Sequence, residues 1–67
     1  MKLKDCQFGI FVKENIEKIY LEEDRPKKAR IGHITGVTEN SIKEVILMVR
    51  WMDGEESNIH PDNVEKI

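Results

Sequence analysis

The clearest pattern in the chain is a two-residue alternation of side chains between positions 44 and 52. One face of this segment consists of Val45, Leu47, Val49 and Trp51, and the other of Ile46, Met48, Arg50 and Met52. A period of two is typical of a β-strand. Because both faces are largely apolar, we expect a central strand, or one whose second face is covered by a loop or a partner.

Shorter runs of the same kind predict four more strands, at 6–13, 29–37, 55–59 and 64–67. Gly9 interrupts the first run, which indicates a bulge or a sharp coil of the sheet. The parity of the second run shifts at Gly32-His33, where we expect a bulge or a strong bend. By parity, Phe8 belongs to the core. Asp53-Gly54 predicts a two-residue hairpin turn, because both residues tolerate positive φ angles.

Residues 14–25 fit two patterns. Ile16, Ile19 and Tyr20 form a helical stripe, with Asn15 in the capping position. Ile16 and Tyr20 also share strand parity with Lys18 and Glu22. We therefore expect an irregular excursion that contains one turn of helix or a short strand.

The segment 60–63 predicts a tight helical turn before the last strand, because Pro61 has no N–H to continue a ladder. The chain then holds five short strands, one hairpin and one helical turn within 67 residues. This pattern predicts an all-β fold in a single domain that spans residues 1–67. Five short strands protect their edges best by curling into a small barrel.

Length and composition restrict the classes of function. Hydrophobic residues make up 39% of the chain and charged residues 36%, as in soluble globular domains. A core of this size supplies roughly 3–5 kcal/mol of net stability, so a deep substrate cavity would remove packing that the fold needs. We therefore do not expect the chain to be an enzyme. With one cysteine, no apolar run of membrane-spanning length and no signal peptide, we expect a cytoplasmic protein outside the membrane.

Charge is unevenly distributed along the chain, whose formal net charge is −2. Residues 1–42 hold eight basic and seven acidic side chains, whereas residues 43–67 hold three basic and six acidic ones. A dedicated nucleic-acid-binding protein usually carries a basic excess, which is missing here. The acidic C-terminal third serves either solubility or the attraction of a basic partner.

No set of residues has the spacing of a catalytic or metal site. Cys6 lies on the predicted apolar face of the first strand, where an unpaired cysteine acts as a small hydrophobic residue. His33 and His60 have no recognised metal-ligand spacing with Cys6. The carboxylates of residues 53–56 lack the alternating pattern of a calcium loop. We expect no metal and no cofactor.

The stretch from Pro26 to Ile67 resembles small SH3-like barrels of the Tudor and KOW type. The segments that match are Gly32–Val37, Val49–Glu55 and Ile59–Val64. The resemblance implies a five-stranded SH3-like barrel with a helical turn before the last strand, and it implies a binding module. Its relatives contact proteins, RNA, DNA or polymerases, and single-domain proteins of this kind look like small accessory proteins of bacteria or phages.

Two binding surfaces follow from these patterns. The candidate protein-binding residues are Trp51, Tyr20, Met48, Arg50 and Met52, together with the acidic hairpin residues Asp53, Glu55 and Glu56. Trp51 belongs either to the core or to an exposed rim. The exposed apolar stripe formed by Ile46, Met48 and Met52 suits a protein partner or a second copy of the chain, unless residues 16–21 cover it. The alternative is a contact with RNA, DNA or a ribonucleoprotein through the basic residues Lys27, Lys28 and Arg30.

Overall fold

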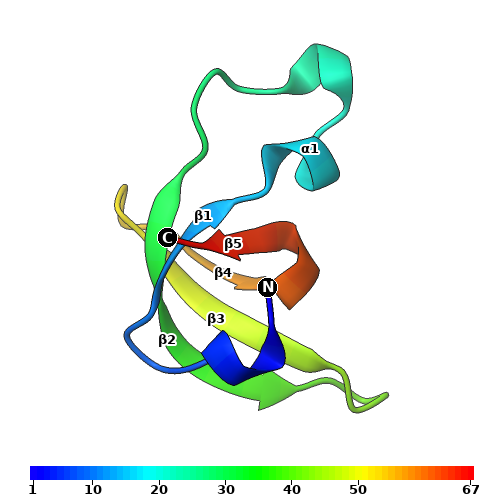
Figure 1. The fold of residues 1–67 in the computed structure, drawn as a ribbon, viewed down its shortest axis with the longest axis vertical. Helices are drawn as coiled ribbons and strands as arrows, with labels where there is room; N and C mark the ends of the chain where they lie inside the picture. The colour runs from blue at the N-terminus through cyan, green and yellow to red at the C-terminus, as the bar shows by residue number, and fades with distance from the viewer.

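Five strands form one antiparallel sheet in the computed structural model, which describes all 67 residues (Figure 1). The strands are β1 (Phe11–Glu14), β2 (Ile31–Glu39), β3 (Val45–Trp51), β4 (Glu56–Ile59) and β5 (Val64–Lys66). The remaining elements are the single-turn helix α1 (Ile16–Ile19) and the 3-10 turns η1 (Leu3–Asp5), η2 (Glu22–Asp24) and η3 (Pro61–Asn63). The predicted all-β class and the helical turn before the last strand are confirmed.

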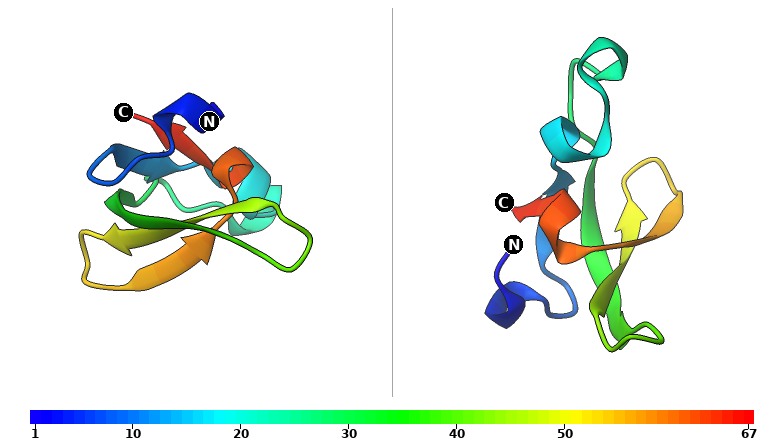
Figure 2. Two further views of the ribbon diagram at one scale, coloured as in Figure 1. Left: turned by 90° about the horizontal axis from the view of Figure 1, so that it is seen from below. Right: turned by 90° about the vertical axis from the view of Figure 1, so that its right-hand side faces the viewer.

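The sheet has the strand order β4-β3-β2-β1-β5 and coils around its core (Figure 2). The first strand pairs with both β2 and the last strand, so segments far apart in the sequence lie side by side. No ladder joins β4 to β5. Hydrogen bonds therefore do not close the predicted barrel, and β4 and β5 remain edge strands.

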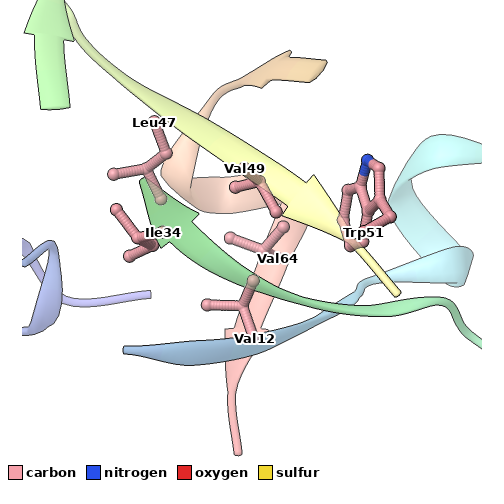
Figure 3. Close-up of a cluster of buried hydrophobic side chains, with 6 residues drawn as sticks. All are labelled: Val12, Ile34, Leu47, Val49, Trp51 and Val64. Carbon is pink, nitrogen blue, oxygen red and sulfur yellow. The ribbon is translucent and has the colours of Figure 1, made fainter. Parts of the chain in front are cut away.

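Six side chains form the buried core (Figure 3). Three come from β3, and β1, β2 and β5 each supply one: Leu47, Val49, Trp51, Val12, Ile34 and Val64. The inner face predicted for the central strand is therefore confirmed. Full burial of one such side chain contributes roughly 1.5–3 kcal/mol, so this small cluster supplies much of the apolar stabilisation.

Residues 6–10 form a turn instead of the predicted first half of a strand. The N–H of Ile10 donates to the carbonyl of Gln7 (3.2 Å), and Gly9 has a φ of 85°. Ile10 and Cys6 pack against the core as their parity predicts, but Phe8 lies within the turn and is 77% exposed. The assignment of Phe8 to the core was wrong, because the alternation does not continue through a turn.

The irregularity in β2 lies between Ile34 and Gly36, beyond the predicted position at Gly32-His33. Gly32 itself stays in regular register opposite Trp51. A Cβ atom at Gly32 would lie 2.5 Å from the carbonyl oxygen of Arg50. Glycine is thus required at this position for the close approach of β2 to β3, and the shift of parity comes later, at Thr35.

The hairpin between β3 and β4 has a three-residue loop, so the predicted two-residue turn was wrong. The N–H of Trp51 donates to the carbonyl of Glu55 (2.8 Å), and the N–H of Gly54 donates to that of Trp51 (2.9 Å). Within this loop only Gly54 has a positive φ, of 96°. A turn that ends in a left-handed glycine is the common three-residue hairpin connection.

The excursion between β1 and β2 contains α1 and η2 and extends beyond one end of the sheet (Figure 1). The expected turn of helix is thus present. Asn15 occupies the N-cap position, but its side chain makes no capping hydrogen bond. Its backbone N–H donates to the carbonyl of Asn63 (2.8 Å), which fastens α1 beside η3. None of the helices is long and apolar enough to cross a lipid bilayer.

We predict that Gly32→Ala lowers the free energy of unfolding by about 2 kcal/mol or more, because the new methyl group would collide with the β3 backbone. Gly36→Ala is the matched control in the same strand. A Cβ atom there would meet the Met48 sulfur at 3.1 Å, and this flexible side chain can move. Urea denaturation of both variants measures the difference, and equal losses of stability would contradict the role of Gly32.

Candidate functional site

One face of the sheet, here called the outer face, points away from the core and crosses all five strands. Phe11, His33, Arg50 and Glu56 are direct neighbours in the ladder from β1 to β4. Ile67 continues this row, because its N–H donates to the carbonyl of Phe11 (3.2 Å). The ring of Phe11 also contacts that of His33, with 6.0 Å between the ring centres.

Several large apolar side chains on the outer face are exposed to solvent. They are Phe11, Ile31, Met48, Met52 and Ile67, with exposed fractions between 41% for Ile31 and 79% for Met52. In contrast, Ile46 is half-buried. The helix α1 packs beside η3, and Met48 and Met52 stay exposed, so residues 16–21 do not cover the predicted stripe. The outer face therefore carries five of the ten large apolar side chains that are exposed in the molecule.

A shallow groove of about 280 Å³ lies beside the stripe, along β3 and β4. It is lined by Thr35, Met48, Val49, Glu56, Ser57 and Asn58. The Thr35 hydroxyl, at the bulge of β2, donates to the carbonyl of Met48 (3.3 Å). The bulge thus sets one wall of the groove, and most of the remaining lining is polar.

Trp51 belongs to the core and not to an exposed rim, since only 2% of its surface is accessible. Its indole N–H donates to the Ser57 hydroxyl (3.1 Å). The guanidinium group of Arg30 lies over the ring, 4.7 Å from its centre, in the geometry of a cation–π contact. The surface that faces solvent above the indole is therefore formed by Arg30, and the indole itself is not available for binding.

Arg30 is surrounded by carboxylates. Its Nε lies 3.3 Å from Glu14, and its Nη1 lies 3.0 Å from Glu55 and 3.5 Å from Asp53. Burial alone would lower the pKa of Arg30, but the charges and hydrogen bonds of these carboxylates raise it above its ordinary value. The charge of Arg30 is thus compensated within the chain, and of the predicted basic triad only Lys27 and Lys28 remain exposed and without an ion pair.

Glu14 is the buried member of this cluster, with 4% of its surface accessible. It accepts hydrogen bonds from the backbone N–H of Arg30 (2.9 Å) and from the hydroxyl of the half-buried Tyr20 (3.3 Å). Sequence analysis missed this role. The signal was present, because Glu14 shares its parity with Val12 and thus occupies an inward position of the strand.

The acidic hairpin residues are exposed but engaged in ion pairs. Asp53 and Glu55 contact Arg30, and Glu56 lies 3.3 Å from Nε of Arg50 on the outer face. The Glu56–Arg50 pair is exposed at both members and contributes only about 0–1 kcal/mol, so a partner can replace it at little cost. Asp53 and Glu55, in contrast, belong to the cluster that holds Arg30 over Trp51.

The cysteine and histidine side chains that the sequence offered as candidates for catalysis or metal binding do not form a site. Burial raises the pKa of the Cys6 thiol, which reduces the fraction of reactive thiolate. His60 accepts a hydrogen bond from the N–H of Asp62 (3.1 Å) and lies 3.5 Å from Glu44. No group of three or more His, Cys, Asp or Glu side chains is placed to hold a metal ion.

Comparison with known proteins gives no match: no family model, no curated protein and no solved structure resembles the chain significantly. Any statement about function therefore depends on the geometry of the surfaces described above.

We predict that Glu14→Ala lowers the free energy of unfolding by about 2 kcal/mol, because it removes the carboxylate that pairs with Arg30 in a partly buried setting. Glu17→Ala, at an exposed position of α1, removes the same charge and should change the stability by less than about 0.5 kcal/mol. Urea denaturation of both variants provides the comparison. Similar effects in the two variants would show that Glu14 acts only through its charge at the surface.

Proposed function

We propose that the chain is a non-catalytic interaction module that binds a protein partner through its outer face. We further propose that its sheet is an SH3-like barrel of the Tudor or KOW type. The position of β5 beside β1, with a 3-10 turn directly before β5, supports this assignment. A small accessory factor of a bacterium or phage, acting in the cytoplasm, is the biological role that fits such a module.

The exposed apolar side chains of the outer face carry the proposal. Five large apolar side chains, 41–79% exposed, lie on this one face among polar neighbours such as His33 and Arg50, and exposed apolar side chains gathered on one face are typical of a surface that binds a partner. Two of the residues, Met48 and Met52, have flexible side chains that adapt to different surfaces. Arg50 between them adds a residue type that is enriched in protein interfaces.

Charge adds a preference for the kind of partner. Asp53, Glu55 and Glu56 lie at one margin of the outer face, and the C-terminal third of the chain is acidic. An acidic margin accelerates the approach of a basic partner and disfavours an acidic one. A second copy of the chain, associating through Ile46, Met48 and Met52, is the other occupant that the same face could take.

Contact with nucleic acid is the second candidate. Lys27 and Lys28 are exposed and make no ion pair, which leaves their charges available to phosphates. Arg30 is already paired with carboxylates, and Glu22, Glu23 and Asp24 precede the lysines in the same excursion. These contacts favour the protein partner over the nucleic acid.

We predict that Met48→Glu leaves the protein folded but removes its partner or its self-association. Met48 is 44% exposed, so a carboxylate there can reach water, whereas it would disrupt an apolar interface. Ile42→Glu is the matched control, because Ile42 is exposed in the turn between β2 and β3 and lies outside the outer face.

Thermal melting, light scattering and affinity capture from a nuclease-treated lysate together test this prediction. The wild type and Ile42→Glu should recover the same partner, and Met48→Glu should not. A Met48→Glu variant with unchanged mass and unchanged partners would disprove the proposed role of the outer face.

We predict only weak binding of RNA or DNA, with an affinity that falls steeply as salt increases. Lys27→Ala combined with Lys28→Ala should abolish this binding. The matched control is Lys2→Ala combined with Lys4→Ala, which removes two exposed charges elsewhere. Fluorescence anisotropy with a labelled oligonucleotide measures the affinities. Tight binding that is lost in the Lys27→Ala, Lys28→Ala variant would favour the second candidate, and tight binding that is insensitive to salt would contradict this prediction.

A further inference from the structure

The outer edge of β4 carries backbone groups without partners. Trp51 and Glu55 form a hydrogen-bonded pair where the hairpin closes. Hydrogen-bonded and non-hydrogen-bonded pairs alternate along an antiparallel ladder, and β4 continues in register with Glu56 opposite Arg50 and Asn58 opposite Met48. The N–H and C=O groups of Glu56 and Asn58 therefore point away from β3, toward solvent.

No other segment runs along the outer side of β4, which forms one margin of the sheet (Figure 2). The opposite edge differs. There β5 is flanked by the N-terminal segment, since Lys66 pairs with Asp5 (3.3 Å) and the terminal amine donates to the carbonyl of Pro61 (3.2 Å). Of the two edges of the sheet, β4 is thus the one that can accept an additional strand.

The acidic side chains around β4 favour a bound strand that carries basic residues. Glu56 points to the outer face at this edge, and Glu55 and Asp53 lie in the adjoining loop. The strand itself contains no lysine, arginine or proline. The groove beside Met48 and Asn58 opens next to it and offers room for a side chain.

We propose that the β4 edge binds an extended, basic peptide segment of the protein partner as a sixth strand. Main-chain hydrogen bonds to Glu56 and Asn58 provide the attachment. A lysine or arginine opposite Glu56 supplies charge complementarity, and the side chain two residues further along lies opposite Asn58, next to the groove. This inference rests on the proposed function and adds to it the partner's chemistry and mode of binding.

A second copy of the chain lacks the matching charge at this edge. Antiparallel pairing of two β4 strands centred on Ser57 would place Glu56 of each copy opposite Asn58 of the other, and β4 holds no lysine or arginine to pair with Glu56. Opposite-charge pairs across strands are stabilising, so the edge favours a basic peptide over a second copy of β4.

The probe is a library of ten-residue peptides with lysine or arginine at alternate positions and random residues between them. We expect a selected peptide to protect the amides of Glu56 and Asn58 from hydrogen exchange, which NMR of the full chain detects residue by residue. In the protein alone both amides should exchange quickly. Two N-methylated versions of the peptide, at odd or at even residues, should differ at least tenfold in affinity, because only one set of N–H groups faces β4.

Variants of the chain test the same contacts. Asn58→Pro removes an outward N–H without removing a bond to β3, and it should weaken the peptide at least tenfold. Glu55→Gln combined with Glu56→Gln should also weaken it about tenfold at low salt. The matched control, Glu22→Gln combined with Glu23→Gln in η2, changes the net charge equally and should leave the affinity within twofold. Should Asn58→Pro not fold, the N-methylated peptides still test the contact.

Three results would overturn the inference: no binder in the library, a bound peptide that leaves Glu56 and Asn58 unprotected, or equal affinities of the two N-methylated versions. Any of these, obtained while Met48→Glu still loses a captured partner, would refute the edge contact and leave the proposed function intact. A failure of the proposed function itself appears separately, as an unchanged partner set in Met48→Glu.

Discussion

The guanidinium group of Arg30 joins three parts of this molecule that are far apart in the sequence. It lies on the Trp51 ring from β3, pairs with Glu14 from β1 and reaches Asp53 and Glu55 in the β3–β4 hairpin. A core of six side chains is small, and its largest member lies at one end of β3. A cation held by three carboxylates covers this indole and keeps it away from water, so that only 2% of the Trp51 surface is exposed. The excursion and the hairpin are consequently fixed relative to each other.

That arrangement also determines where a partner can bind. The end of the sheet near Trp51 is occupied by the chain's own ionic cluster, so the indole and Arg30 are not available. The outer face and the β4 edge carry no comparable internal contacts, since their ion pairs are exposed and weak. Apolar side chains on the outer face and unpaired backbone groups on its margin are adjacent, and one bound segment could use both.

Much of the fold could be predicted from the alternation of side chains, because the inner positions of β3 and the Pro61 turn depend on local patterns. The predictions were wrong where the conformation of a segment depends on its tertiary contacts. A turn at Gly9 exposed Phe8. Gly32 serves the close approach of β2 to β3, and the irregularity of β2 lies at Thr35 instead. The position of Glu14 was visible in its parity, but its partner Arg30 was not, because residues sixteen apart meet only through the β1–β2 ladder. Similarly, no local pattern could show that the final residue would extend the outer face beside Phe11.

The pairing of β1 with β5 has a consequence for how the molecule folds. The strands β2, β3 and β4 are joined by short turns and can form a meander from contacts local in sequence. Val64, in contrast, enters the core only when β5 pairs with β1, across almost the whole chain. Closing so long a loop is entropically costly and slow compared with hairpin formation. The core therefore lacks Val64 until β5 docks, and during synthesis it stays incomplete until β5 has left the ribosome.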